Sequence, residues 1–205
     1  MAGTVIRSFA SPYPGPQALA WDGRTLWMVT NSIARLYQIN PTTGQGIRYI
    51  SIPSGTSVGV AWDGRTLWIS DYDGDLISQL DPTAGRVIRR FASPSTEASG
   101  LAWDGRALWI ANKLIDNIYQ VDPVTGRVLR SFVAPSPTPA GLAWDGRALW
   151  IAGDSTALIY QVDPVTGRVL RSFASPGAAP TGVAWDGQTL WVPDWYNDRI
   201  YQLSV

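Results

Sequence analysis

An eight-residue motif recurs along the chain at a constant interval. AWDGRTLW begins at Ala20 and Ala61, AWDGRALW at Ala102 and Ala143, and AWDGQTLW at Ala184, so that consecutive copies start 41 residues apart. Repeats of this length are typical of solenoids and propellers, in which one unit buries its apolar face only against its neighbours.

The last unit is divided between the two ends of the chain. The 22 residues from Ala184 to Val205 and the 19 residues before Ala20 together make one more 41-residue unit. Complete units contain YQVDPVTGRVLRSFASP, of which the C-terminus has YQLSV and the N-terminus has TVIRSFASP. The division therefore falls in a turn between two strands. We expect the segment from Thr4 to Phe9 to be the outermost strand of the sheet that begins at Ala184, which closes a ring.

Each unit reads as four short strands. In the third and fourth units these are approximately AGLAWD, ALWIAN, LIYQVD and RVLRSF. Asp-Gly follows the first strand and Asp-Pro-Val-Thr-Gly separates the last two, and both are tight-turn sequences. Pro and Gly recur too often for helical repeats. The sequence predicts an all-β, five-bladed β-propeller with four-stranded antiparallel blades. It forms one domain over residues 1–205, with units at 20–60, 61–101, 102–142, 143–183, and 184–205 plus 1–19.

Ten of the eleven Trp residues occupy two fixed positions per unit, such as Trp21 and Trp27 in the first. We expect both rings to fill the space between adjacent blades. A small residue precedes them in every unit, and we expect it in the innermost strand, where five strands converge on the axis. These small residues are Ala18, Gly59, Gly100, Gly141 and Gly182.

The charge distribution argues against two classes of partner. Sixteen basic and sixteen acidic residues cancel, and most arginines recur at fixed repeat positions instead of clustering. A nucleic-acid-binding protein needs a basic stripe, and a peripheral membrane protein needs a basic face. No uninterrupted apolar stretch approaches the length that spans a membrane. We therefore expect neither nucleic acid nor a membrane as partner, and we expect the closed ring to be a monomer.

The pattern P-x-G-[LV]-A-W-D-G followed by I-Y-Q-V-D-P-x-T-G resembles the NHL-like repeats of bacterial propellers, and the resemblance covers the whole chain. NHL-like rings usually have six blades, so five is a departure. Five-bladed propellers include the tachylectin-type sugar-binding lectins and the plant-type glutaminyl cyclases. The resemblance implies architecture more than activity, because such repeats serve binding proteins, enzymes and designed scaffolds. The closeness of the copies is typical of recent amplification or of an engineered repeat protein.

The five copies differ mainly in two sets of loops. In an NHL-like blade, the Asp-Gly and DPxTG turns lie on one face of the disc. The loops between the second and third strands, and the loops that join blades, lie on the other face, which we call the variable-loop face. Loops on a rigid scaffold commonly carry binding residues, although unconstrained drift gives the same pattern. We expect any ligand on the variable-loop face, near the mouth of the central channel.

An aromatic pair stands out among these loops. Trp195 is the one Trp outside the fixed positions, and Tyr196 follows it. If exposed, the pair offers a stacking surface for a sugar or another flat ligand, and Tyr13 in the adjoining loop would extend it. The alternative is that Trp195 folds over its own hairpin. The residues expected to bind a small molecule, a glycan or a peptide are Tyr13, Asp71, Tyr72, Lys113, Trp195 and Tyr196.

Asp71, Asp73 and Asp75 alternate as carboxylates do in calcium loops. Asp71 and Asp75 have Asn or Asp counterparts in other units, which favours a role within the hairpin. Three carboxylates alone also fall short of the six to eight oxygens that Ca²⁺ takes. We expect no metal and no other cofactor.

Catalysis would have to rely on few residue types. The chain has no His and no Cys, and so lacks the commonest general base and the commonest thiol nucleophile. We expect no catalytic residue, and therefore a non-catalytic binding module or scaffold, lectin-like or peptide-binding. The alternative is a small enzyme that uses carboxylates on the variable-loop face. Resemblance to the glutaminyl cyclases would require an acidic proton shuttle there, and Glu97 is the one Glu of the chain.

Overall fold

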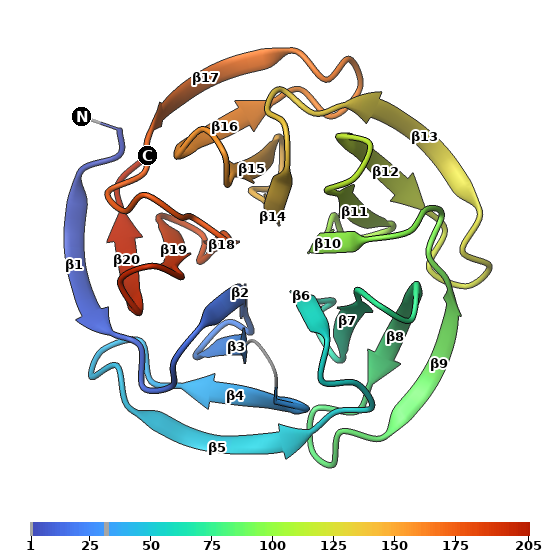
Figure 1. The fold of residues 1–205 in the computed structure, drawn as a ribbon, viewed down its shortest axis with the longest axis horizontal. Coiled ribbons are helices and arrows are strands. Elements are labelled where there is room, and N and C mark those ends of the chain that lie inside the picture. The colour runs from blue at the N-terminus through green and yellow to red at the C-terminus, as the bar shows by residue number, and fades with distance from the viewer. Residues whose placement is uncertain (1, 31–32) are drawn as a thin grey trace.

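The computed structural model describes residues 2–30 and 33–205, which form a ring of five four-stranded antiparallel sheets (Figure 1). The predicted five-bladed β-propeller is confirmed. The described residues are strands, turns and irregular segments, and they contain no helix that could cross a membrane.

The strands have four equivalent places in the blades. The innermost strands are β2 (Pro16–Trp21), β6 (Ser57–Trp62), β10 (Ala98–Trp103), β14 (Pro139–Trp144) and β18 (Ala184–Trp185). The second strands are β3 (Leu26–Thr30), β7 (Leu67–Asp71), β11 (Leu108–Asn112), β15 (Leu149–Gly153) and β19 (Leu190–Asp194). The third strands are β4 (Arg35–Ile39), β8 (Leu76–Leu80), β12 (Asn117–Val121), β16 (Leu158–Val162) and β20 (Arg199–Leu203). The outermost strands are β5 (Gly46–Ser51), β9 (Val87–Ala92), β13 (Val128–Val133), β17 (Val169–Ala174) and β1 (Val5–Ala10).

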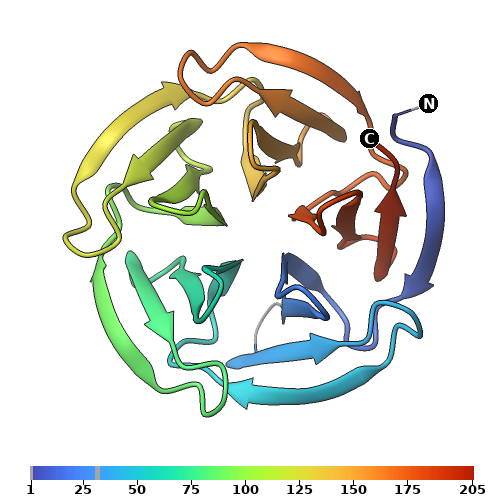
Figure 2. The same cartoon turned by 180° about the vertical axis from the view of Figure 1, so that it is seen from behind.

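The two ends of the chain meet in the fifth blade, as the divided repeat predicts. β1 pairs antiparallel with β20, with Ser8 opposite Tyr201 and Phe9 opposite Ile200. Both termini lie beside this blade in the two opposite views of the ring (Figures 1 and 2). The blades do not begin at the same residue as the repeat units counted from Ala20. The innermost strand of the first blade, for example, begins at Pro16.

The second Trp of each unit is core. Trp109 is 1% exposed, and its counterparts in the other blades are buried as deeply. Its indole N–H donates to Oδ2 of Asp104 at 2.8 Å, and the same bond recurs in all five blades. This bond fastens the Asp-Gly turn to the second strand. At Asp22 burial raises the pKa, but hydrogen bonds from Thr25 and its neighbours outweigh burial and hold that pKa below its usual value.

The first Trp of each unit also packs against an apolar cluster between two adjacent blades, as expected, and in addition it reaches the central channel. Trp21 is half-buried, ends the innermost strand and packs against the cluster between the first and fifth blades. With its four counterparts it lines a cavity of about 70 Å³ at the Asp-Gly end of the channel. The innermost strands do approach one another closely. A Cβ added to Gly100 would lie 2.6 Å from the Cα of Gly141, which explains the small residue at this place.

Candidate functional site

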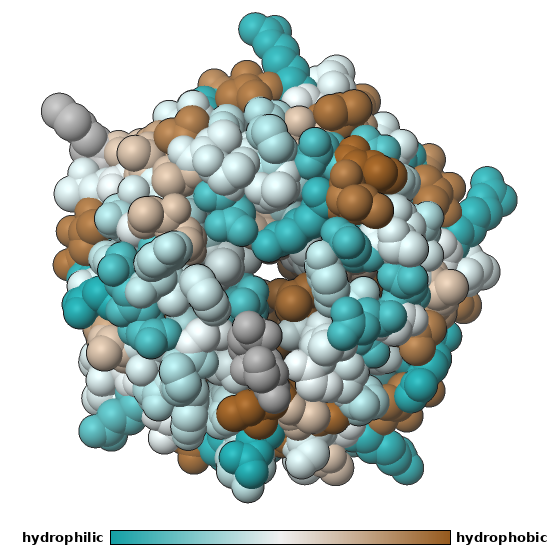
Figure 3. Space-filling model, in the orientation of Figure 1, coloured by the Kyte–Doolittle hydropathy of each residue, from teal (hydrophilic) through white to brown (hydrophobic). Residues whose placement is uncertain are grey.

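The chain reverses at every strand, so the loops alternate between the two faces of the disc. Loops between second and third strands therefore share the variable-loop face with the loops that join blades. Figure 3 shows this face, with an opening at its centre. Both sets of loops therefore lie on one face of the disc, as the resemblance to NHL-like repeats implied.

One repeat position contributes three side chains to this opening. The residue directly after the second strand is Tyr72, Lys113, Asp154 and Trp195 in the second to fifth blades. Its counterpart in the first blade, Asn31, lies outside the described residues. Lys113, Asp154 and Trp195 line an open hollow of about 330 Å³. The hollow is also lined by Gln17, Thr181 and Tyr196. It therefore joins residues of four blades at the mouth of the channel.

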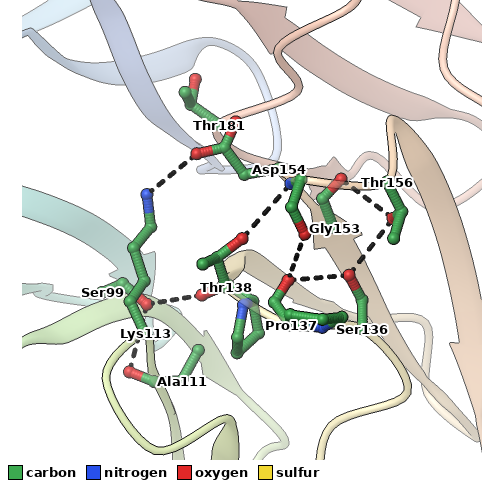
Figure 4. A network of polar contacts seen from close by, with 12 residues as sticks. Ser99, Ala111, Lys113, Ser136, Pro137, Thr138, Gly153, Asp154, Thr156 and Thr181 are labelled. Carbon is green, nitrogen blue, oxygen red and sulfur yellow. Dashed lines mark hydrogen bonds and ion pairs between the residues drawn. The ribbon is translucent and has the colours of Figure 1, made fainter.

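A carboxylate and an ammonium lie together in the hollow. Nζ of Lys113 is 3.4 Å from Oδ2 of Asp154, and Figure 4 shows the lysine extended from the third blade toward the fourth. The two side chains are 25% and 35% exposed, so water and small solutes reach both. The hollow thus offers one acidic and one basic group to a bound molecule.

The aromatic pair forms one wall of the hollow. The rings of Trp195 and Tyr196 meet edge to face, with centroids 5.7 Å apart and an interplanar angle of 90°. Trp195 is 43% exposed and Tyr196 is 76% exposed. The pair is therefore open to solvent, as a stacking surface requires.

The structure does not bring Tyr13 to this pair. Its ring stacks on Tyr37 instead, with centroids 3.7 Å apart and an interplanar angle of 22°. Tyr37 lies in the third strand of the first blade, and Tyr13 is absent from the lining of the hollow. The sequence placed both residues in loops of one face, but the direction of the Tyr13 side chain depends on packing between blades.

Asp71 holds the loops of its own blade. Its Oδ1 accepts hydrogen bonds from Oγ of Ser54 at 2.9 Å, Oγ1 of Thr56 at 2.8 Å and the backbone N–H of Gly74 at 3.2 Å. Oδ1 of Asp75 accepts the backbone N–H of Glu97 at 3.2 Å. In residues 2–30 and 33–205, no three acidic side chains gather as a metal ion requires.

Tyr72 lies beside Glu97 and does not line the hollow. Burial, followed by a hydrogen bond and charge repulsion from the Glu97 carboxylate, raises the pKa of Tyr72 to about 12. The nearby Asp73 contributes in the same direction. Tyr72 is consequently a neutral hydroxyl at ordinary pH. The Glu97 carboxylate interacts with Tyr72, whereas the partner of Lys113 is Asp154.

Sequence reasoning missed Gln17, Asp154 and Thr181. A signal for Asp154 was present, since it lies 41 residues after Lys113 and 41 before Trp195. Gln17 and Thr181 also share one repeat position, directly before the small residue of the innermost strand. Thr181 has a second function, because its hydroxyl donates to the carbonyl oxygen of Pro16 at 2.8 Å and joins the fifth blade to the first.

The sequence matches no protein family and no curated protein. Its fold is similar to that of solved structures. A glutaminyl cyclase from Myxococcus xanthus aligns over 98% of this chain and 94% of its own, with a TM-score of 0.82 and 15% identity. A chain of the mitotic checkpoint complex aligns over 94% of this chain and 62% of its own, with a TM-score of 0.61 and 18% identity. At these identities the similarity shows the fold.

The first of these structures corrects the expectation that the chain is not an enzyme. An enzyme has this five-bladed fold over nearly the same length, so the scaffold is compatible with catalysis. The expectation rested on the missing His and Cys, which exclude His-based and thiol chemistry but leave carboxylate and amine groups. Asp154 and Lys113 supply both groups in the hollow. The assignment to NHL-like repeats has no family match and stays a prediction.

Proposed function

We propose that this chain is an enzyme that cyclises an amino-terminal glutaminyl residue in the hollow at the channel mouth. The observation that carries the proposal is the Lys113–Asp154 pair, which lies beside an exposed aromatic wall on a fold shared with a glutaminyl cyclase. The proposal keeps the site on the variable-loop face. It replaces Glu97 with Asp154 as the carboxylate that moves the proton.

The reaction needs one proton transfer and no added reagent. The α-amino nitrogen of the substrate attacks the carbonyl carbon of its own side-chain amide, and a carbon–nitrogen bond closes a five-membered lactam. The bond from that carbon to the amide nitrogen then breaks, and ammonia leaves. The attacking nitrogen loses one proton and the leaving nitrogen gains one. A single carboxylate between the two nitrogens can therefore serve as base and then as acid.

Asp154 is the carboxylate placed for this transfer, because it lines the hollow and stays accessible beside Lys113. The ammonium of Lys113 can stabilise the negative charge that develops on the carbonyl oxygen during attack. Trp195 and Tyr196 provide an apolar wall for the forming ring. Gln17 and Thr181 add polar groups at the same hollow for the backbone of the peptide.

The test measures ammonia release and the matching loss of mass from a peptide with amino-terminal Gln. We expect turnover by the unmodified chain. We expect Asp154→Asn to lower kcat by about 10²-fold or more, since general acid–base groups contribute that much. Lys113→Met should lower kcat by a similar factor. Asp73→Asn is the matched control, because Asp73 is exposed in a neighbouring loop and does not line the hollow.

Two results would contradict the proposal. The first is the absence of ammonia release from any peptide with amino-terminal Gln, under conditions where the protein is folded. The second is turnover by Asp154→Asn at the rate of the unmodified chain. Binding of such peptides without chemistry would assign the hollow to recognition alone.

A further inference from the structure

Two large aliphatic side chains are exposed at the tip of the β11–β12 loop. Leu114 is 59% exposed and Ile115 is 49% exposed. The same two positions are Asp73 and Gly74 in the second blade and Ser155 and Thr156 in the fourth. Figure 3 shows an apolar patch over this part of the third blade, on the same face as the central opening. Ile33 of the first blade stands at the Ile115 position, and Tyr196 of the fifth blade stands at the Leu114 position; both are exposed. Two adjacent aliphatic residues at these positions occur in the third repeat alone.

The loop that carries these side chains is held by a buried amide. Asn112 is 1% exposed, and its Oδ1 accepts the backbone N–H groups of Leu114 at 3.0 Å and Ile115 at 2.9 Å. Its Nδ2 donates to Oγ of Ser95 at 3.1 Å and to the carbonyl oxygen of Thr96. The backbone of the tip is therefore fixed, and the two side chains are presented to solvent without a cost for ordering the loop on binding.

The tip directly follows a residue of the hollow along the chain. Lys113 lines the hollow, and Leu114 and Ile115 are the next two residues of the chain. Successive residues of an extended peptide advance by about 3.3 Å. A peptide with its first residue at the Lys113–Asp154 pair would therefore bring its second or third side chain to this tip. The aromatic wall of Trp195 and Tyr196 belongs to the fifth blade, on the other side of the ion pair.

We infer that Leu114 and Ile115 form a subsite for an apolar side chain at the second or third residue of the peptide substrate. The inference rests on the proposed function for the position of the first residue. Burial of one aliphatic side chain changes affinity by about tenfold or more. The subsite should consequently act on KM and leave kcat nearly unchanged, since it does not touch the reacting atoms.

The test compares peptides that begin Gln-Leu-Leu with peptides that begin Gln-Ser-Ser and are otherwise identical. We expect kcat/KM to be about tenfold higher for the apolar peptide, mainly through KM. The double variant Leu114→Ser with Ile115→Ser should remove that preference. The matched control is Val124→Ser with Val165→Ser, which changes two exposed apolar residues in DPVTG turns of the opposite face. The control should keep the preference.

A second measurement separates this inference from the proposed function. Calorimetric titration uses the same two peptides with amino-terminal Asn, whose shorter side chain does not form the five-membered lactam. Tighter binding of the Leu-Leu peptide, lost in the double variant, supports the subsite even if no ammonia is ever released. Cyclisation with equal kcat/KM for both Gln peptides would overturn the subsite and leave the proposed function intact. This comparison uses the unmodified chain, so it decides the question even if the double variant does not fold.

Discussion

Lys113 and Asp154 form an ion pair across a blade boundary although they occupy the same position in successive repeats, with Nζ and Oδ2 3.4 Å apart. A symmetric ring would place identical side chains at this position. Here the position is Tyr72, Lys113, Asp154 and Trp195 in four blades, so the ring of backbone is regular while its mouth is chemically asymmetric. Asymmetry of this kind gives a bound molecule one preferred orientation.

The ion pair should contribute little to stability. Both side chains are partly exposed, and solvent-accessible pairs typically contribute less than about 1 kcal/mol. A double-mutant cycle with Lys113→Met and Asp154→Asn, followed by urea unfolding, should give a coupling free energy below about 1 kcal/mol. A coupling of several kcal/mol would mean that the pair holds the blades together, and a loss of activity in either variant would then have a structural explanation.

Trp109 and Trp195 should differ sharply in their effects on stability. Trp109→Ala removes a buried ring and leaves the Asp104 carboxylate without its indole donor, which should cost about 3–5 kcal/mol. Trp195→Ala removes a ring that is 43% exposed and should cost about 1 kcal/mol or less. Denaturant unfolding of both variants measures the two costs. Equal costs would show that Trp195 is part of the core.

Deletion of residues 1–10 should expose the edge of β20 and promote aggregation. The deletion removes β1, which pairs with Arg199–Leu203, and it removes Phe9, whose ring lies 6.0 Å from that of Trp191. An unpaired strand edge is a template for association between chains. Size-exclusion chromatography and thermal unfolding measure the effect. A truncated chain that stays monomeric with an unchanged Tm would contradict the closure of the ring by this strand.

The pKa of Tyr72 should fall when Glu97 loses its charge. Burial and the Glu97 carboxylate raise this pKa to about 12, because a neighbouring negative charge disfavours the phenolate. Glu97→Gln should lower it toward the usual value of about 10, while burial keeps it above that value. Ultraviolet titration measures phenolate formation, and Tyr72→Phe identifies which part of the signal belongs to this residue. An unchanged titration curve in Glu97→Gln would contradict the contact.

The sequence was sufficient for the fold because every local signal repeats five times in one register. Trp109, the Asp-Gly turns and the small residue at Gly100 each have counterparts that agree. The candidate site was predicted less well because it consists of the residues that break the repeat. Tyr13 was predicted near Trp195 because both lie in loops of the same face. The Tyr13 side chain instead points toward Tyr37, on which its ring stacks. Asp154 was missed because its importance comes from its distance to Lys113, which only the closed ring defines.

The pairing of β1 with β20 leaves both chain ends at one turn of one blade. The backbone N–H of Gly3 donates to the carbonyl oxygen of Ser204 at 2.8 Å, so a short linker can join the termini. Four other blades have an intact DPVTG-type turn at the equivalent place. The same ring can therefore be produced as a circular permutant that opens at any of them. Each permutant would move the free ends relative to the Lys113–Asp154 pair, so fused domains could be attached at chosen distances from the channel mouth.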